Sequence, residues 1–261
     1  MLKFAANLSW LFNEVPLIER FSQAATAGFQ GTECLFPYQE PIDSLVNAQR
    51  SSGLPVVLIN APPGRWDQGE RGLASLPKRE EEFRQSLQQA REYALALGCK
   101  QIHIMAGNRN SSITEQQQYD ILVKRLRYAA DYLLADNIRV LIEPLNTEDM
   151  PGYFISTFTR AIQLIKECNK ENIFLQFDIY HCQKIQGNIS RSLQHYWPLI
   201  SHLQIASVPN RNEPDGGEIN YPWLFNYLAS HHYSGWIGCE YQPQTTTREG
   251  LDWFTHYKTI N

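Results

Sequence analysis

The sequence predicts one (β/α)8 barrel, an α/β fold in which eight parallel strands each lead into a helix. Short apolar runs rich in β-branched and aromatic residues alternate eight times with longer segments of helical periodicity. The chain has 261 residues, and roughly 250 residues is typical of this barrel. No linker, low-complexity tract or charge run interrupts the alternation. We therefore expect residues 1–261 to form a single domain.

Each strand is expected where a run of four to eight mainly apolar residues is bounded by turn-forming residues. These runs are Lys3 to Leu8, Gly31 to Phe36, Pro55 to Asn60, Gln101 to Ala106, Arg139 to Glu143, Ile173 to Asp178, His202 to Ala206 and Trp236 to Glu240.

Each helix is expected where apolar residues recur at spacings of three and four. The segments are Pro16 to Ala27, Ile42 to Ser52, Lys78 to Leu97, Thr114 to Ala135, Thr157 to Glu167, Ser190 to Leu199, Tyr221 to Ser230 and Thr247 to Tyr257. Ser112 or Thr114 can cap the fourth segment. An open doubly wound sheet has a similar order of elements, but the glycine-rich phosphate loop of its dinucleotide-binding form is missing after the first strand.

The longest connections follow strands and would lie at the C-terminal face of the barrel, where active sites are built. They are Ala61 to Pro77, Leu145 to Ser156 and Ser207 to Asn220.

Composition excludes several classes of partner. The net charge is −4, from 23 Lys and Arg against 27 Asp and Glu, which disfavours nucleic-acid binding. No apolar stretch approaches the roughly 18 residues of a membrane span, and no targeting signal is visible. Five cysteines without a C-x-x-C pair fit reduced thiols in a cytoplasmic protein.

Four polar residues stand near the ends of strands five to eight, namely Glu143, Asp178, Gln204 and Glu240. A carboxylate in an apolar strand must be paired, neutralised or bound to a metal. These four strands carry no Lys or Arg among their central residues, so ion pairs explain the set poorly. Carboxylate and amide oxygens are hard donors, so we expect a divalent metal, Mg²⁺ or Mn²⁺.

Three carboxylates around a dication leave a net charge of about −1, and an anionic substrate would make it −2, so a cation from a loop is expected nearby. Arg65, Arg71 and Arg211 lie in the long loops and are the candidates. His181, three residues after Asp178, is a candidate hydrogen-bond donor to the substrate. For His202 we expect a structural or surface role, and for Trp10 mainly packing.

Several long strings identify a resemblance to hydroxypyruvate isomerases and the related 2-oxo-tetronate isomerases, which are xylose-isomerase-like barrels. The strings include FAANLSWLF, GFQGTECLFPY, GERGLASLP, LIEPLN, FDIYHCQ, HLQIASVPNRNEPDGGEINY and GCEYQPQTTTREGL, and the resemblance covers nearly the whole chain. It implies metal ligation by Glu143, Asp178, Gln204 and Glu240, with acid and base roles for Glu143 and Glu240.

The implied reaction is isomerisation of a small hydroxy-keto acid by proton transfer through a cis-enediolate. The substrate would be hydroxypyruvate, giving tartronate semialdehyde, or 2-oxo-tetronate, giving 3-oxo-tetronate; Arg65 and Ser207 depart from the hydroxypyruvate isomerase pattern and favour the four-carbon acid. Arg71, Arg211 and His181 would bind the substrate. Sugar epimerases of this fold generally have a His in place of Gln204. The alternatives are a sugar epimerase or lyase on the same barrel, or a non-catalytic ligand-binding barrel. A homo-oligomer is allowed by the sequence.

Overall fold

Eight strands hydrogen-bond in chain order as a closed barrel, in a computed structural model that describes residues 1–257. The strands are β1 (Lys3–Asn7), β2 (Gly31–Cys34), β3 (Val56–Asn60), β4 (Gln101–His103), β5 (Arg139–Ile142), β6 (Ile173–Asp178), β7 (Ile200–Ile205) and β8 (Trp236–Cys239). The predicted parallel (β/α)8 barrel is therefore confirmed. The described residues fall into two compact units, one of Met1–Val57 with the chain from Phe177 onward and the other of Leu58–Gln176. That all of them form a single domain stays a prediction.

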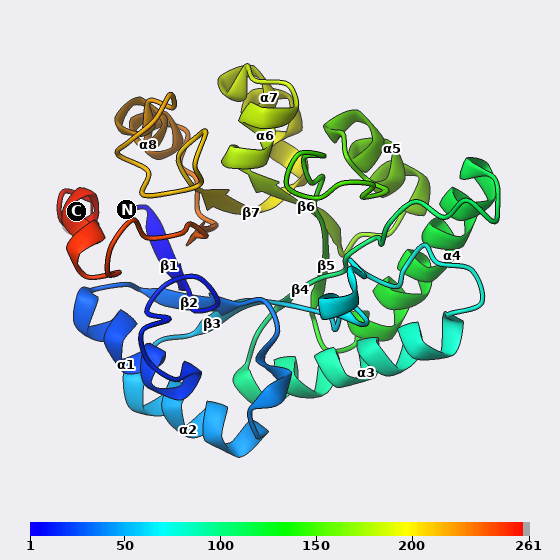
Figure 1. Cartoon of the computed structure of the whole chain (residues 1–261), viewed down its shortest axis with the longest axis horizontal. Coiled ribbons are helices and arrows are strands. Elements are labelled where there is room, and N and C mark those ends of the chain that lie inside the picture. Colours follow the sequence, from blue (N-terminus) through cyan, green and yellow to red (C-terminus); the bar gives the residue numbers. More distant parts are fainter. Residues whose placement is uncertain (258–261) are drawn as a thin grey trace. The chain divides into compact units, whose positions relative to one another are not determined.

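In the first unit, β1 pairs in parallel with both β2 and β8. Helices α1 (Leu17–Ala27) and α2 (Ile42–Ser52) lie on the outer side of β1 and β2 (Figure 1). Phe4 of β1 makes edge contacts with Phe225 of α8 (Tyr221–Ser230) and with Phe254 of α9 (Asp252–Thr255), at ring centroid distances of 5.3 and 5.6 Å. Aromatic side chains thus pack α8 and α9 against β1.

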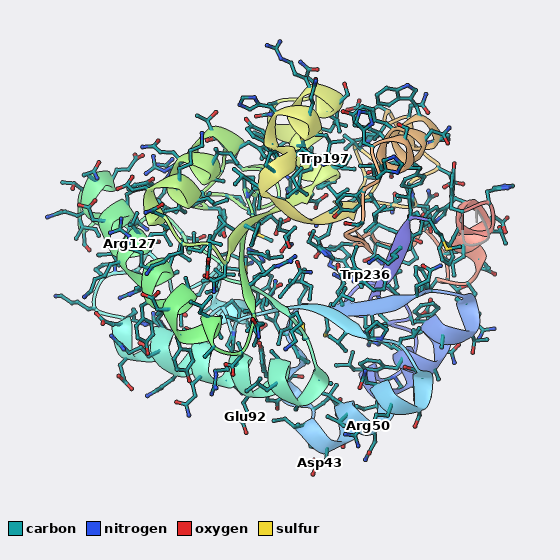
Figure 2. The ribbon with its side chains drawn as sticks, turned by 180° about the vertical axis from the view of Figure 1, so that it is seen from behind. Asp43, Arg50, Glu92, Arg127, Trp197 and Trp236 are labelled. Carbon is teal, nitrogen blue, oxygen red and sulfur yellow. The ribbon has the colours of Figure 1, made fainter. Side chains whose placement is uncertain are left out.

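Trp236, labelled in Figure 2, fills space beside the start of β2. A Cβ atom at Gly31 would lie 2.9 Å from the Trp236 ring, closer than carbon atoms can approach without movement. On the neighbouring strand, the Lys3 ammonium lies 4.8 Å from the centre of the same ring. Gly31 is therefore needed at this position because the indole occupies the place of a side chain.

In the second unit, α3 (Glu80–Leu97), α4 (Glu115–Leu134) and α5 (Phe158–Cys168) follow β3, β4 and β5. The Thr114 hydroxyl accepts from the Gln117 backbone N–H, and the Gln117 side chain accepts from the Thr114 N–H, so the expected cap of α4 is a complete capping box. Glu92 and Arg127 mark the outer faces of α3 and α4 in Figure 2.

The structure corrects three helix predictions in the last third of the chain. A short helix that was not predicted, α6 (Ile179–Ile185), begins directly after β6, because Asp178 acts as its N-cap. The predicted helix from Ser190 is α7 (Ile189–Tyr196) followed by a 3₁₀ turn at Trp197–Leu199. The predicted helix from Thr247 contains only a 3₁₀ turn, Glu249–Leu251, and α9. Among the described residues, none of the helices has the length and apolarity required to cross a membrane.

Candidate active site

The end of β6 carries one of the predicted ligands. Asp178 is the last residue of β6 and is buried. Its Oδ1 accepts a hydrogen bond from the backbone N–H of Tyr180 at 2.8 Å, so the same carboxylate caps α6. The first turn of α6 brings His181 back toward this carboxylate, with 3.7 Å between His181 Nε2 and Asp178 Oδ2. The D-x-x-H spacing therefore places a buried imidazole beside a buried carboxylate.

Arg211, from the loop after β7, lies between Asp178 and Glu240. Its Nη2 atom is 2.9 Å from Glu240 Oε2 and 3.4 Å from Asp178 Oδ2. The guanidinium carbon lies 4.9 Å from the centre of the Trp10 ring and 4.8 Å from that of Tyr180. Two rings and two carboxylates thus hold one cation, which is how Arg is stabilised at such a site. The Trp10 indole N–H also donates to Glu240 Oε1 at 3.2 Å.

Burial governs the protonation of these two carboxyl groups. Removal from water raises the pKa of Asp178 and of Glu240 above the ordinary carboxyl range. The positive charge of Arg211 opposes this shift at both residues, and the negative charge of Glu33 adds to it. A divalent cation would favour the ionised forms, because its charge opposes the effect of desolvation. The donor set of hard oxygens and its excess of negative charge therefore fit Mg²⁺ or Mn²⁺.

Gln204 lies on β7 with its side chain fully buried. Its amide nitrogen donates to Oε1 of Glu33 at 2.8 Å. Glu33 is on β2 and is also buried; it accepts a further hydrogen bond from Asn7 at 2.9 Å, and its Oε2 lies 2.6 Å from His202 Nε2. His202 is thus buried beside Glu33 and does not lie at the surface. Glu33 was not among the predicted site residues.

The fourth predicted ligand, Glu143, follows the last residue of β5 and belongs to the second unit. It is 5% exposed, and its Oε2 accepts from the Gln176 side-chain amide at 3.1 Å. His103 Nδ1 lies 3.7 Å from the same oxygen. Burial lowers the pKa of His103 to about 3, so this imidazole is neutral at physiological pH.

The loop after β3 contains the other two candidate arginines. The Arg71 guanidinium lies 3.9 Å from the centre of the Trp66 ring, and its Nη1 donates to the carbonyl oxygens of Trp66 and Glu70 at 3.0 and 2.9 Å. Arg65 is 63% exposed and pairs with the Glu70 carboxylate at 2.7 Å. Arg71 is therefore held in one orientation, whereas Arg65 belongs to a surface ion pair.

Sequence reasoning missed Glu33, Gln176 and His103, and it expected mainly packing for Trp10, which contacts Glu240 and Arg211. For Glu33 the signal was present, because it is a carboxylate within an apolar strand, the same criterion that selected the four ligands. Glu33 lies on the second strand, whereas the four predicted ligands lie on or directly after the fifth to eighth strands. Gln176 and His103 are polar residues within strands but carry no charge that requires a partner, so nothing distinguished them from ordinary satisfied core polar groups.

A parallel (β/α)8 barrel with buried carboxylates at the ends of its strands is the arrangement expected of a barrel enzyme. The model of the family "Xylose isomerase-like TIM barrel" matches residues 21–257. Relatives of known name cover almost the entire chain. A hydroxypyruvate isomerase from Escherichia coli K12 is 44% identical over 99% of this chain and 100% of its own length. A 2-oxo-tetronate isomerase from Cupriavidus necator is 44% identical over 98% of this chain and 99% of its own length.

The chain therefore belongs to the hydroxypyruvate isomerase family of xylose-isomerase-like TIM barrels, as the sequence motifs indicated, and its class is that of an isomerase. A similar solved structure is that of a Brucella melitensis protein described as an AP endonuclease of family 2. It has a TM-score of 0.96 and 47% identity, covering 98% of this chain and 99% of the other.

Proposed function

We propose that this chain isomerises a small hydroxy-keto acid, either hydroxypyruvate to tartronate semialdehyde or 2-oxo-tetronate to 3-oxo-tetronate, with Mg²⁺ or Mn²⁺ as cofactor. The observation that carries the proposal is the joint burial of Asp178 and Glu240 around Arg211, in a chain whose full-length relatives bear these two names. We propose Glu143, Asp178, Gln204 and Glu240 as the metal ligands. Glu143, Asp178 and His181 are buried acidic and imidazole groups of the type that could hold a metal ion.

The reaction moves one proton from C3 to C2 and one from the C3 hydroxyl to the C2 oxygen, so that the two carbons exchange oxidation level. A bound divalent cation would supply a Lewis acid for the two substrate oxygens. Glu143 and Glu240 are proposed to carry the carbon-bound proton, a contribution typically worth about 10² to 10⁴ in rate. For Glu240, burial favours this role because a carboxyl group with a raised pKa can hold a proton near neutral pH.

Three further side chains would bind and orient the substrate. Arg211 offsets the charge of an anionic substrate, since three carboxylates, one dication and one substrate anion together carry about −2 without it. His181 can donate to a substrate oxygen from beside Asp178. Arg71, whose guanidinium is fixed on Trp66, is the proposed partner for the substrate tail.

The two named relatives have the same identity to this chain, so kinetics must separate their substrates. Steady-state rates with hydroxypyruvate and with 2-oxo-tetronate should show turnover of at least one, abolished by chelator and restored by Mg²⁺ or Mn²⁺. Activity that does not change with chelator would refute the metal cofactor. Turnover of a free ketose in preference to both acids would favour a sugar epimerase. Cleavage of DNA containing an abasic site is a necessary control, because of the description given to the Brucella protein; the net charge of −4 disfavours that activity.

The proton carriers are tested by Glu143→Gln and Glu240→Gln, each expected to lower kcat by at least about 10²-fold. Glu92→Gln, on the exposed face of α3, is the control and should behave as wild type. Product formed in D₂O should carry deuterium at C2. Full activity in either site variant would refute its acid or base role.

A further inference from the structure

Glu33 reaches across the interior of the first unit to the proposed ligand Gln204. It starts from β2, whereas Gln204 is on β7, and strands β1 and β8 lie between them in the barrel order. The path is open because residue 238, directly beside Gln204 on the neighbouring strand, is glycine. A Cβ atom at Gly238 would overlap both carboxylate oxygens of Glu33. The absence of a side chain at Gly238 on β8 therefore leaves the space that the Glu33 carboxylate from β2 occupies.

The Glu33 carboxylate is an acceptor on all three of its contacts. Asn7 and Gln204 donate amide N–H groups to Oε1, and His202 Nε2 lies 2.6 Å from Oε2. Among the described residues His202 Nδ1 has no hydrogen-bond partner, and it is buried. A protonated imidazole would leave an N–H group there without an acceptor, so the neutral Nε2–H tautomer is favoured. Glu33 therefore accepts a hydrogen bond from each of these three side chains.

An ionised carboxylate can only accept hydrogen bonds. The side-chain amide of Gln204 must therefore turn its NH₂ group toward Glu33, which directs its carbonyl oxygen to the opposite side. The carbonyl oxygen is the atom by which an amide binds a hard cation. A reversed amide would place oxygen against oxygen at Glu33 and present NH₂ groups, which cannot ligate, to the metal.

We propose that Glu33 is a positioning residue that holds the Gln204 amide with its carbonyl oxygen toward the divalent cation. The proposal rests on the ligand set of the proposed function. Glu33 does not touch the substrate; it fixes which atom of Gln204 is presented. Loss of such an outer hydrogen-bond partner typically weakens metal binding about 10- to 100-fold.

The test is a Mn²⁺ titration followed by electron paramagnetic resonance of the free ion, with wild type, Glu33→Gln and Gly238→Ala. Glutamine at position 33 can donate as well as accept, so either orientation of the Gln204 amide is satisfied. Gly238→Ala displaces the carboxylate and changes no polar group. Both variants should raise the Kd for Mn²⁺ by about 10- to 100-fold. The Mn²⁺ concentration for half-maximal activity should rise in parallel, with kcat at saturating Mn²⁺ within about threefold of wild type.

The chain offers a matched control in Glu213→Gln. Glu213 is buried in the same unit, its Oε1 accepts from the Gln244 backbone N–H at 3.0 Å, and a Cβ atom at Gly250 would overlap this carboxylate as well. It therefore resembles Glu33 in burial and surroundings, but the group that donates to it is a backbone N–H. The Kd of the Glu213→Gln variant for Mn²⁺ should equal that of wild type. An equal increase in Kd for Glu213→Gln and Glu33→Gln would overturn the positioning role.

The double variant Glu33→Gln with Gln204→Glu provides the rescue. It restores an amide–carboxylate pair with the partners exchanged, and either oxygen of a carboxylate can bind the metal. Mn²⁺ affinity should return to within about fivefold of wild type, and this holds as a test even if Glu33→Gln alone fails to fold. A folded double variant whose Kd for Mn²⁺ stays more than fivefold above that of wild type would overturn the proposal. If wild type itself binds no Mn²⁺, the proposed ligand set fails, whereas equal binding by wild type and Glu33→Gln refutes the positioning role alone.

Discussion

Replacing Trp10 by phenylalanine tests the surroundings of Glu240 with a minimal change. The substitution keeps an aromatic ring beside Arg211 but removes the indole N–H that donates to Glu240 Oε1 at 3.2 Å. A hydrogen bond to a charged group contributes about 1.5 to 3 kcal/mol. This bond is long and Trp10 is half-buried, so we take the lower value, about 1.5 kcal/mol. Since 1.36 kcal/mol corresponds to a factor of about ten, kcat/KM should fall about tenfold.

The assay is steady-state turnover of the preferred hydroxy-keto acid at saturating Mg²⁺, with Trp223→Phe as the control. Trp223 is 50% exposed on α8 and stacks on Tyr227, so its replacement should leave kcat/KM unchanged. The indole N–H of Trp10 lowers the pKa of Glu240 against the larger effect of burial, so the acidic limb of the pH–rate profile should also move to higher pH. A Trp10→Phe enzyme within twofold of wild type would refute the reasoning.

Two further predictions concern stability. Arg125 is buried and donates to backbone carbonyls within 73–76, including two contacts of 2.6 and 2.8 Å. Arg125→Met should therefore lower the free energy of unfolding in urea by about 3 kcal/mol, and an unchanged urea midpoint would contradict this expectation. The variant should also raise KM, because residues 73–76 adjoin Arg71 in the chain. Hydrogen bonds from Arg79 and Arg65 hold the pKa of Glu70 well below its usual value, so its stabilising effect should be complete above about pH 5 and decline as the pH falls. The difference in stability between wild type and Glu70→Gln should thus be larger at pH 7 than at pH 3.5, and equal differences would argue against the ion pair.

The barrel and the strand-end positions of the four proposed ligands could be predicted from the sequence because both depend on local patterns. Apolar periodicity marks the strands, and a charged residue at the end of an apolar run stands out against it. Helix α6 could not be predicted in this way. It depends on the Asp178 carboxylate serving as an N-cap, and Asp178 is also the last residue of β6, so the apolar pattern there indicates only a strand end.

Contacts between segments far apart in the chain could not be predicted from the sequence. Glu33 meets its partners His202 and Gln204 across 169 and 171 residues of chain, and no local pattern links them. The three loop arginines were likewise equivalent in the sequence. Only the structure distinguishes Arg211, which lies against Asp178 and Glu240, from Arg65, which pairs with a surface carboxylate.

The charge on Glu33 has an electrostatic disadvantage that helps to explain its role. It raises the pKa of both Asp178 and Glu240, so it opposes the ionisation that a metal site requires. A neutral acceptor would avoid this effect, but the amide and hydroxyl side chains that could replace it also donate hydrogen bonds. Any of them would satisfy the Gln204 amide in either orientation. An ionised carboxylate accepts without donating, so a negative charge at this position is the property that selects one orientation of Gln204, and the nearby positive charge of Arg211 offsets its effect on Asp178 and Glu240.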